Sequence, residues 1–243
     1  MKGLALVAVA LAAIVAAPAF ADWNPGDSHK MHFPQLPDPT GWDVNATQPK
    51  VLADDWLCTG SGAVADIHWW GSWRQDLVLP IRSFLISIYS DDRTGPYSKP
   101  GELLWSQEFF GGQWTERLYG QGEQGWYDPN TGEAVRPDHN LIFQYNITQI
   151  DEPFIQEEGT IYWLSISADL GTPSASGWGW KTSRDHFEDA AVWGDYPDPQ
   201  WNVLLDPSGD KVLPVLDLAF VITPEPTSLL ILAVGGLLFA RRR

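Results

Sequence analysis

The stretch that decides the fold is Asn140-Leu141-Ile142-Phe143-Gln144-Tyr145-Asn146-Ile147-Thr148-Gln149. Because side chains of a β-strand point alternately to the two sides of a sheet, its two-residue period predicts a strand with one apolar face. One face carries Leu141, Phe143, Tyr145 and Ile147, and the other carries Gln144, Asn146 and Thr148.

Similar segments recur on both sides of this stretch. Residues 82–90 alternate in the same way, with Phe84, Ile86 and Ile88 on one face. Further strands are expected at residues 51–57, 64–70, 103–110, 114–119, 160–168, 178–181, 190–193 and 215–222. Clusters of Asp, Pro, Asn and Gly separate them, and only residues 184–191 suggest a helical turn. Many short strands between frequent turns predict an all-β, antiparallel, sandwich or jelly-roll-like single domain.

We place this domain at residues 51–223. Residues 22–50 are rich in Pro, Asp, Asn and Gly and show no periodicity, so we expect an extended arm that packs Trp42 on the domain. The two ends outside these segments are apolar and are expected to form a signal helix and a sorting helix.

Residues 1–21 have the order of a secretory signal peptide. Lys2 supplies a positive start, residues 4–17 form an apolar run, and Ala19-Phe20-Ala21 fits the small-x-small pattern that signal peptidase cleaves. The run is shorter than the about 20 residues that a membrane-spanning helix needs. We therefore predict export by the Sec machinery and cleavage after Ala21.

Residues 224–243 carry a second signal. Pro224-Glu225-Pro226 is followed by the apolar residues 229–240 and then by Arg241, Arg242 and Arg243. Twelve residues of helix rise about 18 Å, which is less than the roughly 30 Å of a bilayer core. This order resembles the PEP-CTERM sorting tail, and the resemblance implies recognition and cleavage by an exosortase-type membrane enzyme. A plain tail anchor has the same topology without cleavage. The protein is thus expected at the cell envelope, anchored by its tail, or outside the cell after processing.

The remaining core is strongly acidic. Without the end segments it keeps 11 Lys and Arg against 30 Asp and Glu, a net charge of −19. Such a surface repels nucleic-acid phosphates, so no nucleic-acid partner is expected, and it suits neutral glycans, cations or basic partners. The single cysteine, Cys58, excludes an intrachain disulfide and is expected to be a buried thiol.

Sequence blocks across residues 51–222 also resemble an uncharacterised β-rich domain of bacterial PEP-CTERM exoproteins. The resemblance implies an exported β-domain and carries no catalytic residue. The blocks are ADDWLC (53–58), IHWWGSW (67–73), PGELLW (100–105), QEEGTIYWL (156–164), GWKTS (179–183) with Asp185-His186, and AVWG (191–194).

Fourteen tryptophans give the first candidate site. Exposed indole rings in one plane can stack on the apolar faces of sugar rings, whereas buried rings fill a core. Trp69 and Trp70 are adjacent and point to opposite faces of a strand, so one of them is expected in the core. The candidate carbohydrate-binding residues are Trp69, Trp73, Trp178, Trp180 and Trp193.

An acidic segment gives the second candidate. Ca²⁺ prefers several oxygen ligands, but the spacing of a calcium-binding loop is absent, so a hydrogen-bonded loop capped by Asp185 or His186 is the alternative that we favour. No other cofactor is expected. The candidate calcium ligands are Asp185, Glu188, Asp189 and Asp195.

Two functions are compatible with these patterns. The first is a non-enzymatic module that binds carbohydrate or exopolysaccharide through exposed tryptophans, at the envelope or in extracellular matrix. The second is a secreted hydrolase acting on glycans, which needs two carboxylates about 5–10 Å apart. No nucleophile, zinc or phosphate-loop motif is present, so we expect no catalytic residues and favour the first function. Glu102, Glu108 and Glu157 are the acids that the second function would use.

Overall fold

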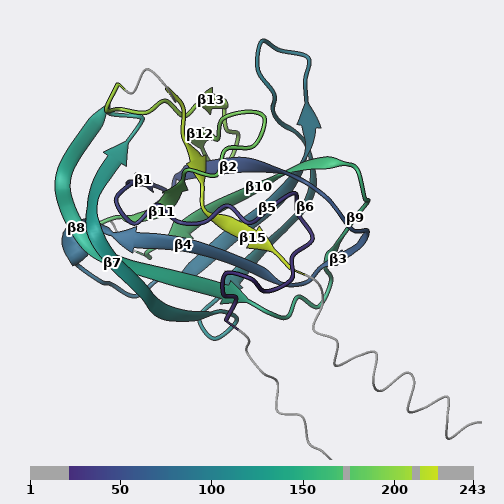
Figure 1. Cartoon of the computed structure of the whole chain (residues 1–243), viewed down its shortest axis with the longest axis horizontal. Helices are drawn as coiled ribbons and strands as arrows, with labels where there is room; N and C mark the ends of the chain where they lie inside the picture. Colours follow the sequence, from purple (N-terminus) through teal and green to yellow (C-terminus); the bar gives the residue numbers. More distant parts are fainter. Residues whose placement is uncertain (1–21, 172–175, 210–213, 224–243) are drawn as a thin grey trace, which may run out of the picture. The chain divides into compact units, whose positions relative to one another are not determined.

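Strands make up almost all of the regular structure. The computed structural model describes residues 22–171, 176–209 and 214–223. Within these ranges the only helical element is a short 3-10 turn, η1, at Arg74–Asp76. Figure 1 shows the strands, with β7 and β8 lying side by side and curving together.

The strands form two large sheets and one small one. The seven-stranded sheet has the order β14-β11-β1-β7-β8-β4-β15, and the six-stranded sheet has the order β13-β12-β2-β10-β5-β6. The first contains β1 (Trp42–Asn45), β4 (Ile67–Trp73), β7 (Thr115–Asp128), β8 (Glu133–Ile147), β11 (Trp178–Ser183), β14 (Asp217–Leu218) and β15 (Phe220–Ile222). The second contains β2 (Lys50–Leu57), β5 (Ser83–Asp92), β6 (Lys99–Phe110), β10 (Ile161–Asp169), β12 (Val192–Asp195) and β13 (Asn202–Val203). The small sheet pairs β3 (Gly62–Val64) with β9 (Phe154–Gln156).

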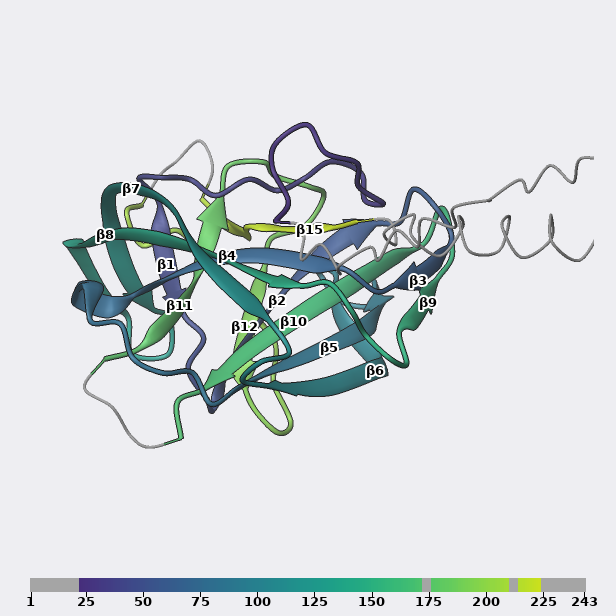
Figure 2. The same ribbon diagram turned by 90° about the horizontal axis from the view of Figure 1, so that it is seen from below.

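An additional pairing between β4 and β11 closes part of the larger sheet. It produces a ring in the order β11, β1, β7, β8, β4. Neighbours in the ring are antiparallel except β1 and β7, which are parallel. Figure 2 shows the other sheet as a layer in which β10, β5 and β6 lie side by side. The fold is therefore all-β, as predicted, and combines a sandwich with a barrel-like section.

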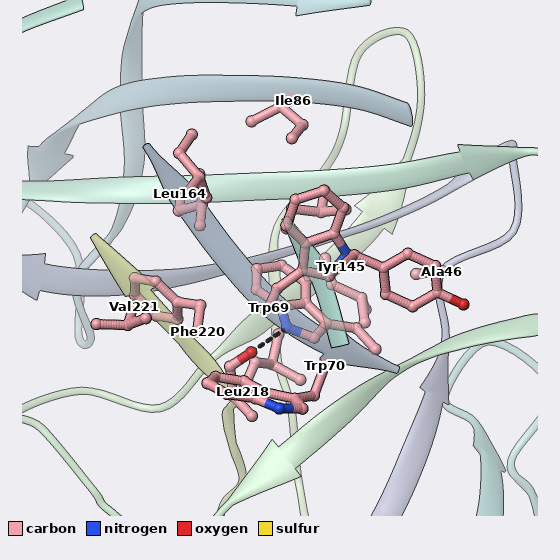
Figure 3. Close-up of a cluster of buried hydrophobic side chains, with 14 of the residues drawn as sticks. Ala46, Trp69, Trp70, Ile86, Tyr145, Leu164, Leu218, Phe220 and Val221 are labelled. Atoms are coloured by element: carbon pink, nitrogen blue, oxygen red, sulfur yellow. Dashed lines mark hydrogen bonds between the residues drawn. The ribbon is translucent and has the colours of Figure 1, made fainter. Parts of the chain in front are cut away.

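The core between the two sheets is aromatic. Phe84 of β5 packs edge-on against Trp69, Tyr145 and Trp178 of the larger sheet, with ring centroids 5.0, 5.3 and 5.1 Å apart. All four side chains are fully buried. Figure 3 shows Trp69 and Tyr145 with Ile86 and Leu164, which come from the facing sheet. Because each such ring buries about 150–250 Å², these contacts supply much of the apolar burial that a domain without disulfides needs.

The ring of five strands encloses polar side chains. Each strand of the ring contributes at least one buried polar residue to this interior, and hydrogen bonds cross the ring between strands that are not neighbours. His139 on β8 bonds Asp43 on β1 at 2.7 Å, and Ser72 on β4 donates to Gln124 on β7 at 3.2 Å. Lys181 on β11 donates to the same Asp43 oxygen at 2.8 Å. The interior of the ring is thus held by charge and hydrogen bonds rather than by apolar packing.

Charges in this interior stabilise one another. Burial alone would raise the pKa of Asp43, but Lys181 and His139 lower it below its ordinary value. Burial alone would lower the pKa of His139, but Asp43 and Asp138 raise it. The carboxylate of the neighbouring Asp138 lies 2.9 Å from Nδ1 of His139, the ring nitrogen that does not face Asp43. An imidazolium between two carboxylates, with the ammonium of Lys181 beside it, leaves the network close to neutral.

The polar face of β8 is covered by the start of the described chain. Gln144 donates its amide N–H to the carbonyl of Trp23 at 2.8 Å, and Asn146 donates to Asp22 at 3.2 Å. Both amide side chains are buried. Both faces of β8 are therefore buried in this part of the strand, although its alternating sequence suggests one buried and one solvated face.

Residues 22–50 belong to the domain instead of forming an extended arm. β1 lies between β11 and β7, and isolated bridges join Met31 to Cys58 and Gln35 to Phe220. Cys58 is buried, as predicted. A strand of four residues that pairs only with distant segments leaves no periodic signal in its own sequence.

β7 and β8 are longer than the expected strands 114–119 and 140–149. Gly122 and Gly125 indicate a loop on propensity alone, but here the glycines allow other segments to approach the strand closely. A Cβ at residue 122 would lie 1.9 Å from the carbonyl oxygen of Pro39, and one at residue 125 would lie 2.4 Å from the ring of Trp42.

Two other expectations concern helices. Residues 184–191 form an irregular loop and not a helical turn. The predicted signal and sorting segments, including Ala19, Ala21, Pro224–Pro226 and Arg241–Arg243, lie outside the described residues. In the part of the chain that the structure describes, no helix is long and apolar enough to span a membrane.

We predict that Asp43→Asn strongly destabilises the fold. The substitution leaves Lys181 and His139 positively charged and buried without their common partner, which costs about 3–5 kcal/mol. Urea denaturation followed by tryptophan fluorescence measures the change.

The matched control is Asp195→Asn. Asp195 pairs with Lys50 at 2.6 Å, but half of its side chain is exposed. Exposed pairs contribute about 0–1 kcal/mol, so this variant should unfold close to the wild type. Equal losses in the two variants would contradict the role assigned to the buried network.

Candidate functional site

Four of the five candidate tryptophans lie in the core. Trp69, Trp73, Trp178 and Trp180 are at most 1% exposed, so they cannot stack on a sugar, and that hypothesis is wrong for them. Trp193 is half-buried and packs against the apolar core.

The rings are buried because both faces of β4 are covered. Trp69 stacks on Tyr145 between the sheets, with centroids 5.7 Å apart. Trp70, on the opposite face, packs against Tyr119 and against Trp23 of the N-terminal segment. One ring of this adjacent pair was expected in the core, and both are there. The second face is closed by segments far from β4 in the sequence.

The four candidate calcium ligands bind four different partners. Asp185 accepts the backbone N–H of Leu36, Glu188 pairs with Arg93, Asp189 accepts the hydroxyl of Ser98, and Asp195 pairs with Lys50. Within the described ranges no three His, Cys, Asp or Glu side chains are grouped so that they could hold a metal ion. The prediction of a calcium site is therefore wrong, because the four carboxylates bind separate partners and do not converge on one point.

A pocket of about 310 Å³ opens where β1, β8 and β11 meet residues 206–208 and 215–216. This volume is at the lower end of the range of about 300–1,000 Å³ for small-molecule sites. Carboxylates, guanidinium groups and one aromatic ring line this pocket. Its principal lining residues are Asp38, Trp42, Arg136, Arg184, Asp206 and Ser208.

Trp42 forms the aromatic wall of this pocket. One face of its ring lies against Gly125, where even a Cβ would collide with the ring. The guanidinium of Arg136 lies 5.6 Å from the ring centroid, within the range of a cation–π contact. The indole N–H donates to Asp206 at 3.3 Å. The ring is 7% exposed and is fixed in place before any ligand arrives.

Two arginines are held at the edge of the pocket. Arg184 donates Nε–H to Asp38 at 2.6 Å, and Arg136 donates to the backbone carbonyl of Thr40. Burial alone would raise the pKa of Asp38, but hydrogen bonds from Arg184 and Thr40 lower it. Asp38 is therefore a stable anion. Since a guanidinium has five donors, the bond to Thr40 leaves N–H groups of Arg136 for a ligand.

The arrangement fits a polyhydroxylated molecule. Carboxylates accept pairs of hydroxyl protons, guanidinium groups donate to hydroxyl or carboxylate oxygens, and an indole packs against C–H groups. The lining residues come from five separate segments of the chain, which the fold brings together. Sequence patterns did not indicate this pocket, and its one visible signal was Trp42, a single aromatic residue in a polar segment.

A second group of acids is buried under the loop at residues 184–191. Asp217 accepts from His186 at 2.8 Å, and Asp54 accepts the backbone N–H of Leu218 at 2.6 Å. Asp55 is fully buried, and neither of its oxygens has a hydrogen-bond partner among the described residues. Burial, together with the charges of Asp217 and Asp189, raises the pKa of Asp55 to about 9.

We predict that Asp55→Asn stabilises the protein near neutral pH. An acid whose folded pKa lies above its unfolded value of 3.8 favours folding below that value. As pH rises from about 4 to about 9, the unfolded state ionises while folded Asp55 keeps its proton, so stability falls. The variant should be about 1–3 kcal/mol more stable than the wild type at pH 8, with a smaller difference at pH 5.

Denaturant midpoints at the two pH values measure this effect. Asp66→Asn is the control, because Asp66 is also buried but lies beside His68 at 2.9 Å. A destabilised Asp55→Asn variant, or one with an unchanged pH dependence, would show that Asp55 carries no proton in the folded state.

Comparison with known proteins identifies a family. A family described as a domain of unknown function, DUF7901, matches the chain over residues 31–223. No curated protein and no solved structure matches the chain. The matched range includes β1 and both sides of the pocket around Trp42. The chain therefore belongs to the DUF7901 family.

Proposed function

We propose that this protein is an exported, non-enzymatic module that binds carbohydrate in the pocket around Trp42. The observation that carries the proposal is the convergence of an aromatic ring, two guanidinium groups and two carboxylates in about 310 Å³. Such a set offers both the apolar contact and the paired hydrogen bonds that a sugar needs. The net charge of −19 for the core argues against nucleic acid as the ligand.

The two ends of the sequence support export. We infer that the Sec machinery and signal peptidase process the chain after Ala21, and that an exosortase-type enzyme acts on the PEP-CTERM-like tail. We propose that the product is envelope-associated or part of an extracellular matrix.

The alternative of a glycan hydrolase gains no support from this pocket. A general acid needs a raised pKa so that it carries a proton at neutral pH. Asp38 has the opposite shift, because Arg184 and Thr40 stabilise its anion. Among the acids that the alternative would use, Glu108 accepts the hydroxyl of Ser83 on the neighbouring strand. We therefore keep binding without turnover as the proposed function.

We predict that Arg136→Ala weakens carbohydrate binding about tenfold or more. The variant removes a donor group and the cation that lies over Trp42, and Arg136 is exposed, so the fold should be retained. Titration calorimetry with polysaccharides selected on a glycan array measures affinity, and release of reducing ends is followed in the same samples.

Arg82→Ala is the matched control, since Arg82 is an exposed arginine that pairs with Asp169 away from the pocket. Equal binding by both variants would contradict the assignment of the pocket. Steady release of reducing ends by the wild type would favour the hydrolase.

We also predict that the mature protein begins at Asp22. Mass spectrometry of the protein recovered from outside the cytoplasm should show loss of residues 1–21, because Ala19 and Ala21 satisfy signal peptidase. Recovery of the intact chain from the cytoplasm would contradict the export proposal.

A further inference from the structure

Among the residues that the structure describes, Arg136 is the one arginine without a carboxylate partner. The chain has 31 Asp and Glu against 15 Lys and Arg, so acids are abundant. The guanidinium that lacks an anion is therefore the one that lies over Trp42 in the pocket. The other arginines of the described ranges form these ion pairs: Arg74 with Glu133, Arg82 with Asp169, Arg93 with Asp91, Arg117 with Asp22, and Arg184 with Asp38.

The fold holds the guanidinium of Arg136 in place without neutralising it. Its contacts are the ring of Trp42, 5.6 Å from the centroid, and the backbone carbonyl of Thr40. Neither of these groups is an anion. The uncompensated charge is felt inside the ring of strands, where burial lowers the pKa of Lys181, Asp43 opposes that shift and Arg136 adds to it.

Asp206 supplies a free acceptor beside the same indole. Its Oδ1 accepts the indole N–H of Trp42 at 3.3 Å and the backbone N–H of Ser208 at 2.7 Å. No donor among the described residues bonds its Oδ2. The pocket thus offers a ligand one charged donor group and one charged acceptor, both positioned by Trp42.

The other carboxylate of the pocket is already occupied. Asp38 Oδ1 accepts from the backbone N–H and the hydroxyl of Thr40, and Oδ2 accepts from Arg184 at 2.6 Å. Asp38 and Arg184 balance each other's charge. The groups left to select a ligand are therefore Arg136 and Asp206.

We propose that this pocket binds an acidic sugar, a pyranose that carries a carboxylate, and that Arg136 pairs with that carboxylate. The inference rests on the proposed function and names its substrate class. A guanidinium presents parallel N–H donors that match both oxygens of a carboxylate. A sugar hydroxyl donates to Asp206 Oδ2, and the C–H face of the pyranose packs on Trp42. A neutral sugar leaves the charge of Arg136 unpaired, and an amino sugar adds a second cation beside it.

The acidic surface of the domain is compatible with an anionic sugar in this pocket. The core has a net charge of −19, but solvent-exposed charges are largely screened beyond about 8 Å at physiological ionic strength. The pair with Arg136 is a direct contact, so it is screened much less than these remote repulsions. The surface charge should slow the approach of a polyanionic chain more than it weakens the bound pair.

The test compares sugars that differ only in the carboxylate. The full protein is titrated calorimetrically, at neutral pH and low ionic strength, with trisaccharides of glucuronate, galacturonate and mannuronate. Each is paired with its carboxyl-reduced counterpart, in which CH₂OH replaces the carboxylate. We expect at least one acidic trisaccharide to bind about tenfold or more tightly than its reduced counterpart. Added salt should diminish this preference.

Variants at Arg136 separate charge from geometry. Arg136→Gln keeps a polar side chain without the charge, so the acidic and reduced sugars should bind alike. Arg136→Lys should retain part of the preference, because an ammonium keeps the charge but loses the two parallel donors. Arg82→Gln is the matched control and should keep the full preference, since Arg82 pairs with Asp169 away from the pocket. Tryptophan fluorescence confirms that each variant is folded.

The outcomes distinguish this inference from the function on which it rests. Equal affinities for acidic and reduced sugars in the wild type, or a preference that persists in Arg136→Gln, would overturn the acidic-sugar class and leave carbohydrate binding intact. Acetate that binds as tightly as the acidic trisaccharides would also overturn it, because the site would then recognise a carboxylate and no sugar. Failure of every sugar to bind would contradict the proposed function as well.

Discussion

The carboxylate of Asp43, held between Lys181 and His139, is the interaction on which the rest of this structure depends. It joins three strands of the closed ring from within. Alternation along a strand then sends the neighbouring side chains to the other side of the sheet. Trp42 precedes Asp43 in β1 and forms the aromatic wall of the pocket. Thr182 follows Lys181 in β11 and lines the same pocket. The buried network inside the ring thus fixes the candidate site outside it.

The alternation of apolar and polar residues predicted those strands that show this pattern in their own sequence. The strands expected at residues 51–57, 82–90 and 160–168 correspond to β2, β5 and β10, which together build the centre of the six-stranded sheet. β1 was missed because four residues in a polar segment gain their structure from distant partners. The open end of the β7–β8 hairpin was predicted, as strands at residues 114–119 and 140–149, but the part next to the turn was not. Contact of Gly122 and Gly125 with residues 39 and 42 decides the conformation of β7 there.

The candidate sites were harder to predict than the strands, for a physical reason. Trp178 and Trp180 lie two apart on one face of β11, as the sequence suggested, but exposure depends on what covers that face. Likewise, Asp185, Glu188 and Asp189 are close in sequence but bind three different segments. A pocket assembled from five separated segments leaves no spacing pattern in the chain. Composition indicated an acidic, tryptophan-rich domain, and only tertiary structure distinguishes rings that fill the core from the ring that lines a pocket.

The central claim is that Trp42, the tryptophan that lines the pocket, meets carbohydrate, and that the tryptophans between the sheets do not. The most direct measurement is the set of indole N–H signals in a ¹⁵N NMR spectrum during titration with a bound oligosaccharide. The account predicts that the signal of Trp42 shifts with saturation, while the signals of Trp69, Trp178 and Trp180 stay fixed and exchange slowly with solvent. Shifts in the buried signals together with an unchanged Trp42 signal would contradict it.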